Sequence, residues 1–107
     1  MTPESSERTR ELYDEVAAKL ADAGVAKGSM FGMPCLKVGK KMLGGIWGDA
    51  MNFKLPPRAR EAALALPGAE PFDPGMGRPM KEWVVVPLAQ ADRWPELAEQ
   101  ALEYVRE

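Results

Sequence analysis

The chain has 107 residues, of which 46% are hydrophobic and 28% charged, and its net charge is −2. This length fits one domain with a modest core, and the composition excludes intrinsic disorder and fibrous repeats. The single cysteine, Cys35, excludes an internal disulfide and suits a reducing compartment, while no apolar run is long enough to cross a bilayer. We therefore expect one cytoplasmic domain over residues 1–107, with no membrane partner.

Charge is segregated along the chain. Residues 1–26 hold three bases and six acids, residues 27–60 hold seven bases and one acid, and residues 61–107 hold four bases and nine acids. The basic segment can form a face for an anionic partner, or the flanking acids can neutralise it when the chain folds. We favour neutralisation by the flanking acids, because charged runs are usually solvated surface.

Residues 7–23 are expected to form an amphipathic helix. Leu12, Val16 and Leu20 recur every four residues, and Gly24 stands where a C-terminal cap belongs. This apolar stripe requires a partner, and the segment that follows is the nearest one.

Residues 27–55 predict an antiparallel meander. Short runs such as 51–55 alternate apolar and polar residues with the period of a strand that has one buried face, so Lys37 and Lys54 are expected on the open face. Turns are expected at 39–41 and at Gly48-Asp49. The glycine pair at 44–45 would weaken its strand unless a bulge or a close neighbour requires it.

The second half of the chain predicts a helix, a loop, a strand and a final helix. Pro56-Pro57 opens a short helix that Pro67-Gly68 ends. Residues 68–80 are rich in proline and glycine and are expected to form a thirteen-residue loop, pinned to the core by Phe72 and Met76.

The strand that follows begins at Trp83, and its unbroken valines indicate a central place in the sheet. Asp92 is the expected N-cap of the last helix, with Pro95 in its first turn. Because strands and helices do not alternate regularly, the expected class is α+β: an antiparallel meander sheet with N-terminal, middle and C-terminal helices packed on it.

No constellation of residues specifies a reaction. The chain has no histidine, so the commonest general base and metal ligand is missing, and we expect no catalytic residue, metal or cofactor. Cys35 has no histidine to activate it and is expected to be a buried thiol, with Lys37 as its only nearby helper. The glycines of the 75–79 loop precede a strand and lack the other residues of a phosphate-binding motif.

The aromatic residues Trp47, Phe53 and Trp83 admit two interpretations. They could stack on the bases of a single-stranded nucleic acid beside a lysine-bearing sheet, or they could be core residues. We favour the core, because large aromatic side chains dominate the interiors of small domains. The methionines are interpreted in the same way, as residues that fill gaps in the core.

Several motifs in order resemble the N-terminal domain of the TfoX/Sxy family. They are the Met-Phe-Gly at 30–32, the Lys-Val-Gly-Lys-Lys-Met at 37–42, the Asn-Phe-Lys-Leu at 52–55, the Glu-Pro-Phe at 70–72 and the strand 80–87 that ends in Val-Pro. The resemblance covers about residues 10–105. A more distant similarity, through the same Gly-Lys turn, is to YjbR-like small proteins.

The resemblance implies an α+β domain from bacterial regulators of competence and transcription, with no catalytic residue to carry over. The founding members join this domain to a helical C-terminal domain, for which 107 residues leave no room, so we expect a stand-alone adaptor. The leading hypothesis is therefore a small non-enzymatic regulatory or interaction domain whose partner is another protein, as a monomer or a homodimer.

Two alternatives stay open. One is weak nucleic-acid or anion binding through the basic segment, which would weaken with salt because released counterions drive it. The other is an enzyme of unknown type, with Cys35, Lys37 and the 78–81 loop as its best site. The candidate binding residues are Lys37, Lys40, Lys41, Lys54, Arg58 and Arg60, with Arg78 and Lys81 as loop candidates.

Overall fold

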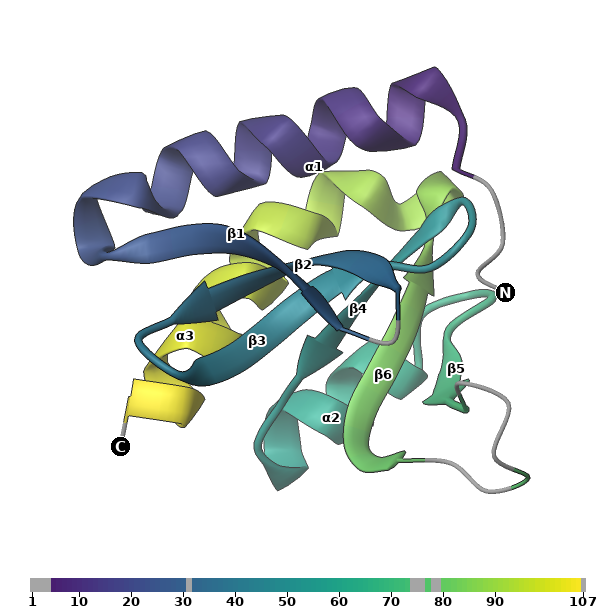
Figure 1. The fold of residues 1–107 in the computed structure, drawn as a ribbon. Helices are drawn as coiled ribbons and strands as arrows, with labels where there is room; N and C mark the ends of the chain where they lie inside the picture. The colour runs from purple at the N-terminus through teal and green to yellow at the C-terminus, as the bar shows by residue number, and fades with distance from the viewer. Residues whose placement is uncertain (1–4, 31, 74–76, 78–79, 107) are drawn as a thin grey trace.

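The structure is a computed structural model of the whole chain, and it describes residues 5–30, 32–73, 77 and 80–106. Three α-helices and six strands make up the described part (Figure 1). In chain order they are α1 (Glu7–Leu20), β1 (Val25–Met30), β2 (Met33–Val38), β3 (Lys41–Ile46), β4 (Ala50–Lys54), α2 (Pro57–Leu64), β5 (Glu70–Phe72), β6 (Met80–Pro87) and α3 (Trp94–Arg106). Short 3-10 helices, Ala21–Ala23 and Leu88–Arg93, follow α1 and precede α3.

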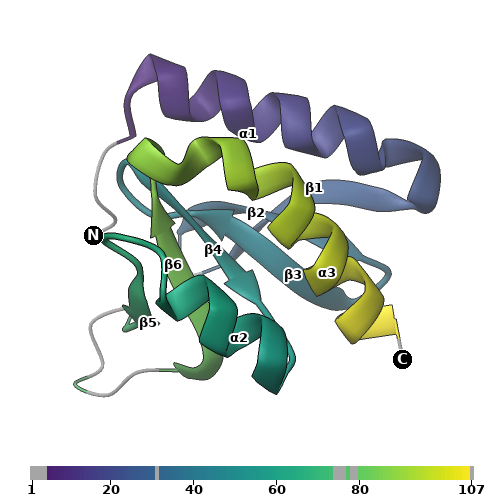
Figure 2. The same cartoon turned by 180° about the vertical axis from the view of Figure 1, so that it is seen from behind.

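The six strands form one sheet in the order β1-β2-β3-β4-β6-β5, and every neighbouring pair is antiparallel. All three helices lie against the same face of this sheet, with α1 and α3 side by side (Figure 2). The α+β class expected from the sequence, with helices at the start, middle and end of the chain, is confirmed.

Helix α1 has the apolar stripe that its sequence predicts and starts at the expected residue, whereas the last three residues of the expected 7–23 helix are 3-10. The Ser6 hydroxyl accepts a hydrogen bond from the Thr9 backbone N–H at 3.2 Å and so caps the first turn. Val16 and Leu20 are buried, and the chain leaves the following 3-10 turn through Gly24 at φ 92°. Left-handed backbone of this kind costs glycine little, which explains the residue at this position.

The glycine pair of β3 lies where the sheet backbones approach most closely. A Cβ on Gly44 would stand 2.6 Å from the Asn52 carbonyl oxygen, and one on Gly45 would stand 2.6 Å from the Pro34 carbonyl oxygen. The β2–β3 register also shifts between Leu36 and Lys37. The strand therefore has both features that were expected to explain a glycine pair: a bulge and a closely packed neighbouring backbone.

The loop expected over residues 68–80 is wrong in part, because β5 lies within it. Glu70 pairs with Val85, and Pro71 pairs with Val84, at the outer edge of the sheet. Proline is acceptable on an edge strand, because a residue there can point its N–H side to solvent and needs no backbone donor for the ladder. Phe72 is fully buried, as predicted, whereas the prediction for Met76 lies outside the described residues.

The final helix begins later than expected. Asp92 lies inside the 3-10 helix Leu88–Arg93, so it is not the N-cap of α3, which starts at Trp94 with Pro95 next. This 3-10 helix connects β6 to α3. The local sequence pattern did not predict it. The apolar stripe of α3 is confirmed: its buried residues are Trp94, Leu97, Ala98, Ala101, Leu102 and Val105.

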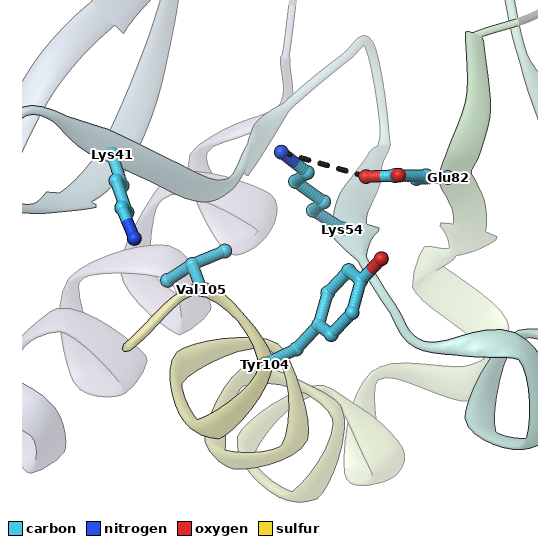
Figure 3. Close-up of a pocket in the computed structure, with 5 residues that line it drawn as sticks. All are labelled: Lys41, Lys54, Glu82, Tyr104 and Val105. Atoms are coloured by element: carbon cyan, nitrogen blue, oxygen red, sulfur yellow. Dashed lines mark ion pairs between the residues drawn. The ribbon is translucent and has the colours of Figure 1, made fainter. Parts of the chain in front are cut away.

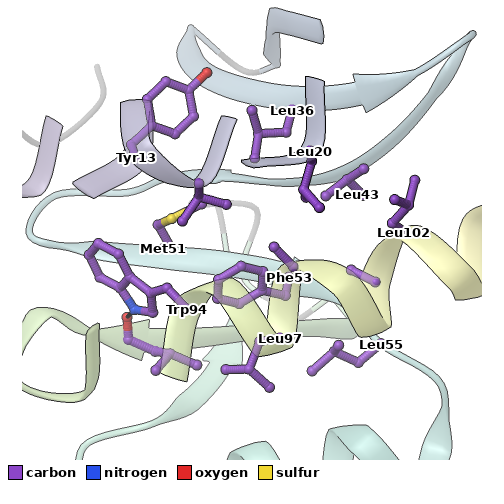
Figure 4. Packing of buried hydrophobic residues seen from close by; sticks show 14 of the residues in the cluster. Tyr13, Leu20, Leu36, Leu43, Met51, Phe53, Leu55, Trp94, Leu97 and Leu102 are labelled. Atoms are coloured by element: carbon purple, nitrogen blue, oxygen red, sulfur yellow. Dashed lines mark hydrogen bonds between the residues drawn. The ribbon is translucent and has the colours of Figure 1, made fainter. Parts of the chain in front are cut away.

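The main core fills the space between the helices and the sheet (Figure 4). Phe53 and Met51 from β4 meet Leu97 and Trp94 from α3, and all four are buried. The Trp94 indole Nε1–H donates a hydrogen bond to the Val86 carbonyl oxygen at 3.1 Å, which ties α3 to β6. The indole thus contributes both buried apolar area and a satisfied polar group.

A second cluster covers the sheet face opposite the helices. Phe72 lies between Trp47 and Trp83, with ring centroids 5.2 Å and 6.3 Å away. The buried members are Met33, Ala50, Phe72, Trp83 and Val85. Phe53 in the main core and Trp83 in this cluster confirm the interpretation of these aromatics as core residues, while Trp47 is half-buried.

Candidate functional site

A pocket of about 390 Å³ opens where α3 ends against the sheet, and it gathers charged residues that are far apart in the sequence (Figure 3). We call it the lysine pocket, and its lining residues are Lys41, Lys54, Glu82, Tyr104 and Val105. These residues come from β3, β4, β6 and α3, so the pocket exists only in the folded domain.

The pocket follows from how β3 and β4 pair. Their ladder runs from Ile46 opposite Met51 to Gly44 opposite Phe53 and includes no earlier residue of β3. Lys41, the first residue of β3, and Lys54, the last of β4, therefore lie on strands that are not paired with each other at this end. Val105, near the end of α3, lies between them, and Tyr104 lies beside Lys54 (Figure 3).

Lys54 and Glu82, both in the lining of the pocket, form an ion pair. The Lys54 Nζ lies 3.5 Å from a carboxylate oxygen of Glu82, and the two side chains are 36% and 42% exposed. Pairs as exposed as this contribute about 0–1 kcal/mol to stability. A hydrogen bond to a charged group contributes about 1.5–3 kcal/mol, so a ligand can share or rearrange this pair at little cost.

A second hollow, of about 360 Å³, adjoins the lysine pocket through shared residues. We call it the side hollow; it is lined by Lys54, Lys81, Glu82 and Trp83. Lys54 and Glu82 belong to both, so the two hollows adjoin at the end of β4 and the start of β6. Three lysines, on β3, β4 and β6, and one carboxylate, Glu82, thus line the two hollows.

The structure brings together two of the six candidate binding residues of the basic segment, Lys41 and Lys54, and adds the loop candidate Lys81 at the side hollow. Lys37 is not among the residues that line the pocket, and its Cε approaches the position of a Cβ on Gly28 to 3.1 Å. Lys40 is exposed in the β2–β3 turn. The other loop candidate, Arg78, lies outside the described residues.

The remaining bases of the segment are separated from the pocket or engaged elsewhere. Lys27 pairs with Asp14 of α1 and lies over the Tyr13 ring. Arg60 in α2 donates from a guanidinium nitrogen to the Leu55 carbonyl oxygen at 3.0 Å, and Arg58 is exposed on the same helix. The bases of the segment are therefore spread over several elements: Lys27 and Lys54 are each paired with an acid, and Lys41 and Lys54 border one pocket.

Tyr104 and Glu82 are the pocket residues that the sequence did not single out for binding. Tyr104 adjoins Val105 at the flank of the apolar stripe of α3, where an aromatic residue reads as part of the core. Glu82 adjoins the buried Trp83 in β6, and its place in the local sequence gives it no binding role. No local signal links either residue to Lys41, because their proximity is set by long-range packing.

Cys35, the best nucleophile candidate, has the environment of a structural thiol. It is fully buried, and burial raises the pKa of the thiol, although Lys37 and the Gly28 backbone N–H act in the opposite direction. The Tyr13 hydroxyl donates a hydrogen bond to the Cys35 carbonyl oxygen at 2.8 Å. A thiolate is therefore disfavoured at neutral pH, and the expectation of a buried thiol is confirmed.

Among the described residues, no three cysteine and carboxylate side chains lie close enough to hold a metal ion. Within the same ranges, no helix has both the length and the apolar surface needed to cross a bilayer. Comparison with known proteins adds no relative, since no family model, curated protein or solved structure matches the chain.

Proposed function

We propose that the chain is a small regulatory or interaction domain, of the kind that the TfoX/Sxy resemblance implies, and that it recognises an anionic group in the lysine pocket. One observation carries the proposal: Lys41 and Lys54, from two strands, border the same pocket as the Tyr104 hydroxyl. Two ammonium groups and a phenol are donors suited to a carboxylate or a phosphate.

A binding role agrees better with the lining of this pocket than a catalytic one does. The one carboxylate, Glu82, is already engaged by Lys54, and Val105 contributes apolar surface. The fully buried Cys35 contributes no nucleophile to it. Binding rather than turnover is therefore the function that these groups support.

A capture experiment with charge-reversed pocket variants tests the proposal. The immobilised wild-type chain and the Lys41→Glu/Lys54→Glu variant are incubated with lysate of the source organism, and retained proteins are quantified by mass spectrometry. A partner that binds through the pocket should be retained on the order of tenfold less by the double variant, because like charges now oppose its anionic group.

Lys40→Glu is the matched control, because Lys40 is exposed in the neighbouring turn and is not part of the pocket lining. Urea unfolding of all three proteins verifies that each is folded. Equal retention by all three would refute the proposal, as would reproducible turnover of a metabolite by the purified wild-type chain.

Nucleic-acid binding is the second candidate, and the position of Lys37, Lys40 and Lys41 around the β2–β3 turn favours it. It predicts that fluorescence anisotropy detects oligonucleotide binding at low ionic strength, with an affinity that falls steeply as salt is added. Lys40→Glu should then weaken binding more than Lys54→Glu does. No binding at low salt would end this candidate.

A further inference from the structure

Strand β1 lies at one edge of the sheet, and within the described part of the chain its outer side is unpaired. It is the first strand in the sheet order and pairs with β2 alone. Ala26, Lys27 and Ser29 of this strand are exposed. The backbone N–H and C=O groups along such an edge can pair with a strand of another molecule. The opposite edge is less suited, because β5 has three residues and one of them is Pro71.

Lys37 of β2 reaches across to this edge strand at Gly28. The position of a Cβ on Gly28 is 3.1 Å from the Lys37 Cε and 3.5 Å from its Nζ, so the ammonium lies over β1. Lys27, the preceding residue of β1, contacts Asp14 and Tyr13 of α1. Because neighbouring residues of a strand point to opposite faces, the Lys37 ammonium lies on the sheet face away from α1.

The Lys37 ammonium has no matching acid at this edge. No acidic side chain of the described residues forms an ion pair with it. Residues 25–30 contain no acid, and Lys27, the base among them, is matched by Asp14. Residues directly opposite each other on neighbouring strands share a face, with Cβ atoms about 4.5–5.5 Å apart. An acidic residue opposite Gly28 on an added strand would therefore reach the Lys37 ammonium.

A second copy of the chain is a poor match for this edge. Pairing of β1 with β1 of another copy would bring a second Lys37 to the same edge and would add no acid. Like charges on neighbouring strands are destabilising, and lysines at a sheet edge oppose self-association in this way. The charges at β1 therefore favour a different chain, one that carries an acidic residue.

We propose that β1 accepts an extended segment of a partner protein as a seventh strand of the sheet, with an aspartate or glutamate of that segment opposite Gly28 and paired with Lys37. Main-chain hydrogen bonds supply the affinity in this mode of recognition, and the acidic side chain sets the register and the specificity. The inference goes beyond the proposed function, because the lining of the lysine pocket includes neither Lys37 nor any residue of β1.

Phage display of random linear peptides on the wild-type chain supplies the probes. We expect the selected peptides to share an acidic residue within a run of β-branched and aromatic residues. One selected peptide is then synthesised, and its complex with the chain is studied by NMR and amide hydrogen exchange. The backbone amides of β1 should shift on binding and become protected, because the added strand pairs with that edge.

Charge reversal at Lys37 tests the side-chain pair. Lys37→Glu should weaken the acidic peptide on the order of tenfold and strengthen the same peptide with lysine in place of its acid, because the cross-strand pair changes sign. Lys37→Gln should weaken the acidic peptide less. Lys40→Glu is the matched control, with the same change in net charge in the adjoining turn, and Lys54→Glu alters the lysine pocket. Both should leave the affinity near that of wild type, and urea unfolding verifies that each variant is folded.

Peptides that protect β1 and respond to the charge swap at Lys37 support the inference. Selected peptides without a shared acidic residue overturn it, as do binding that leaves the β1 amides unprotected and equal losses with Lys37→Glu and Lys40→Glu. Failure to select any peptide overturns it as well. If a single-stranded oligonucleotide then bound the wild-type chain and not Lys37→Glu, Lys37 would belong to the nucleic-acid candidate.

Discussion

Asn52 is a fully buried amide in the middle of the sheet, on the face opposite the helices. It pairs in register with Gly45 on one side and Val85 on the other. Its Nδ2 donates only to the Met33 sulfur, at 3.7 Å, and its Oδ1 accepts no hydrogen bond from the residues that the structure describes. A buried polar atom left in this state is destabilising by about 1–3 kcal/mol.

Replacing this amide with an apolar side chain should therefore stabilise the protein. Asn52→Val is similar in volume and suits a strand, and we expect it to raise the free energy of unfolding by about 1 kcal/mol. Urea unfolding monitored by tryptophan fluorescence measures the change.

Asn52→Asp serves as the control, because it is closer still in shape but places an unpaired charge in the same apolar surroundings. It should lower the free energy of unfolding by several kcal/mol near neutral pH. If Asn52→Val were instead clearly destabilising, the amide would have to make a hydrogen bond that the folded protein requires.

At the scale of elements, close packing of neighbouring strands requires the glycines of β3 but not the glycine of β1. Gly28, Cys35 and Gly45 lie in one cross-strand row. The Cβ position of Gly45 meets the Pro34 backbone oxygen at 2.6 Å, whereas that of Gly28 meets the end of the flexible Lys37 side chain at 3.1 Å. The two glycines thus flank Cys35 on either side and differ in their tolerance for a methyl group.

Gly45→Ala should lower the free energy of unfolding by about 1–3 kcal/mol, because the backbones of β2 and β3 must separate to admit the methyl group. Gly28→Ala should change it by about 0.5 kcal/mol or less, because the lysine side chain can move aside. Urea unfolding of the pair provides the measurement. Equal effects of the two substitutions would contradict this account of the row.

At the scale of the whole molecule, Asp49 joins the start of α1 to the β3–β4 turn. Its Oδ1 accepts hydrogen bonds from the Ser6 backbone N–H at 2.7 Å and from the Thr9 hydroxyl at 2.8 Å. These bonds lower the pKa of the Asp49 carboxyl below its ordinary value of 3.8, led by the bond from the Ser6 backbone. The ionised carboxylate therefore stabilises the docking of the first helix on the sheet.

The sign of this linkage predicts how stability depends on pH. Because the pKa is lower in the folded state, the contribution is complete above the unfolded value of 3.8 and is lost as the pH falls through the folded value. Wild type should exceed Asp49→Asn in free energy of unfolding at neutral pH, and the difference should shrink as the pH is lowered below 3.8.

Denaturant unfolding over this pH range tests the prediction. Ser6→Ala is the companion variant: it removes the cap hydroxyl but keeps the backbone N–H that donates to Asp49. It should therefore lower stability and reduce the pH dependence without abolishing it, because the Ser6 hydroxyl also lowers the pKa of Asp49 while the Ser6 backbone N–H and the Thr9 hydroxyl still act on it. A constant difference between wild type and Asp49→Asn at every pH would disprove the assignment of the effect to this carboxylate.

The sequence alone determined the elements whose cause is local. The stripes of α1 and α3, the glycine turns at 39 and 48 with φ of 60° and 63°, and the burial of Cys35 follow from spacing and residue type. It could not predict β5, because a three-residue strand containing proline is stabilised by its register with β6 and not by any pattern of its own.

Only the tertiary structure decided the candidate site. Composition showed that residues 27–60 are basic. Only the packing of β3, β4 and α3 shows that Lys41 and Lys54 of that segment line one pocket together with Tyr104 and Glu82. Local patterns record which faces are buried, since burial repeats with the period of each element. Which charged ends meet depends on how separate elements pack, and no short stretch of sequence contains that information.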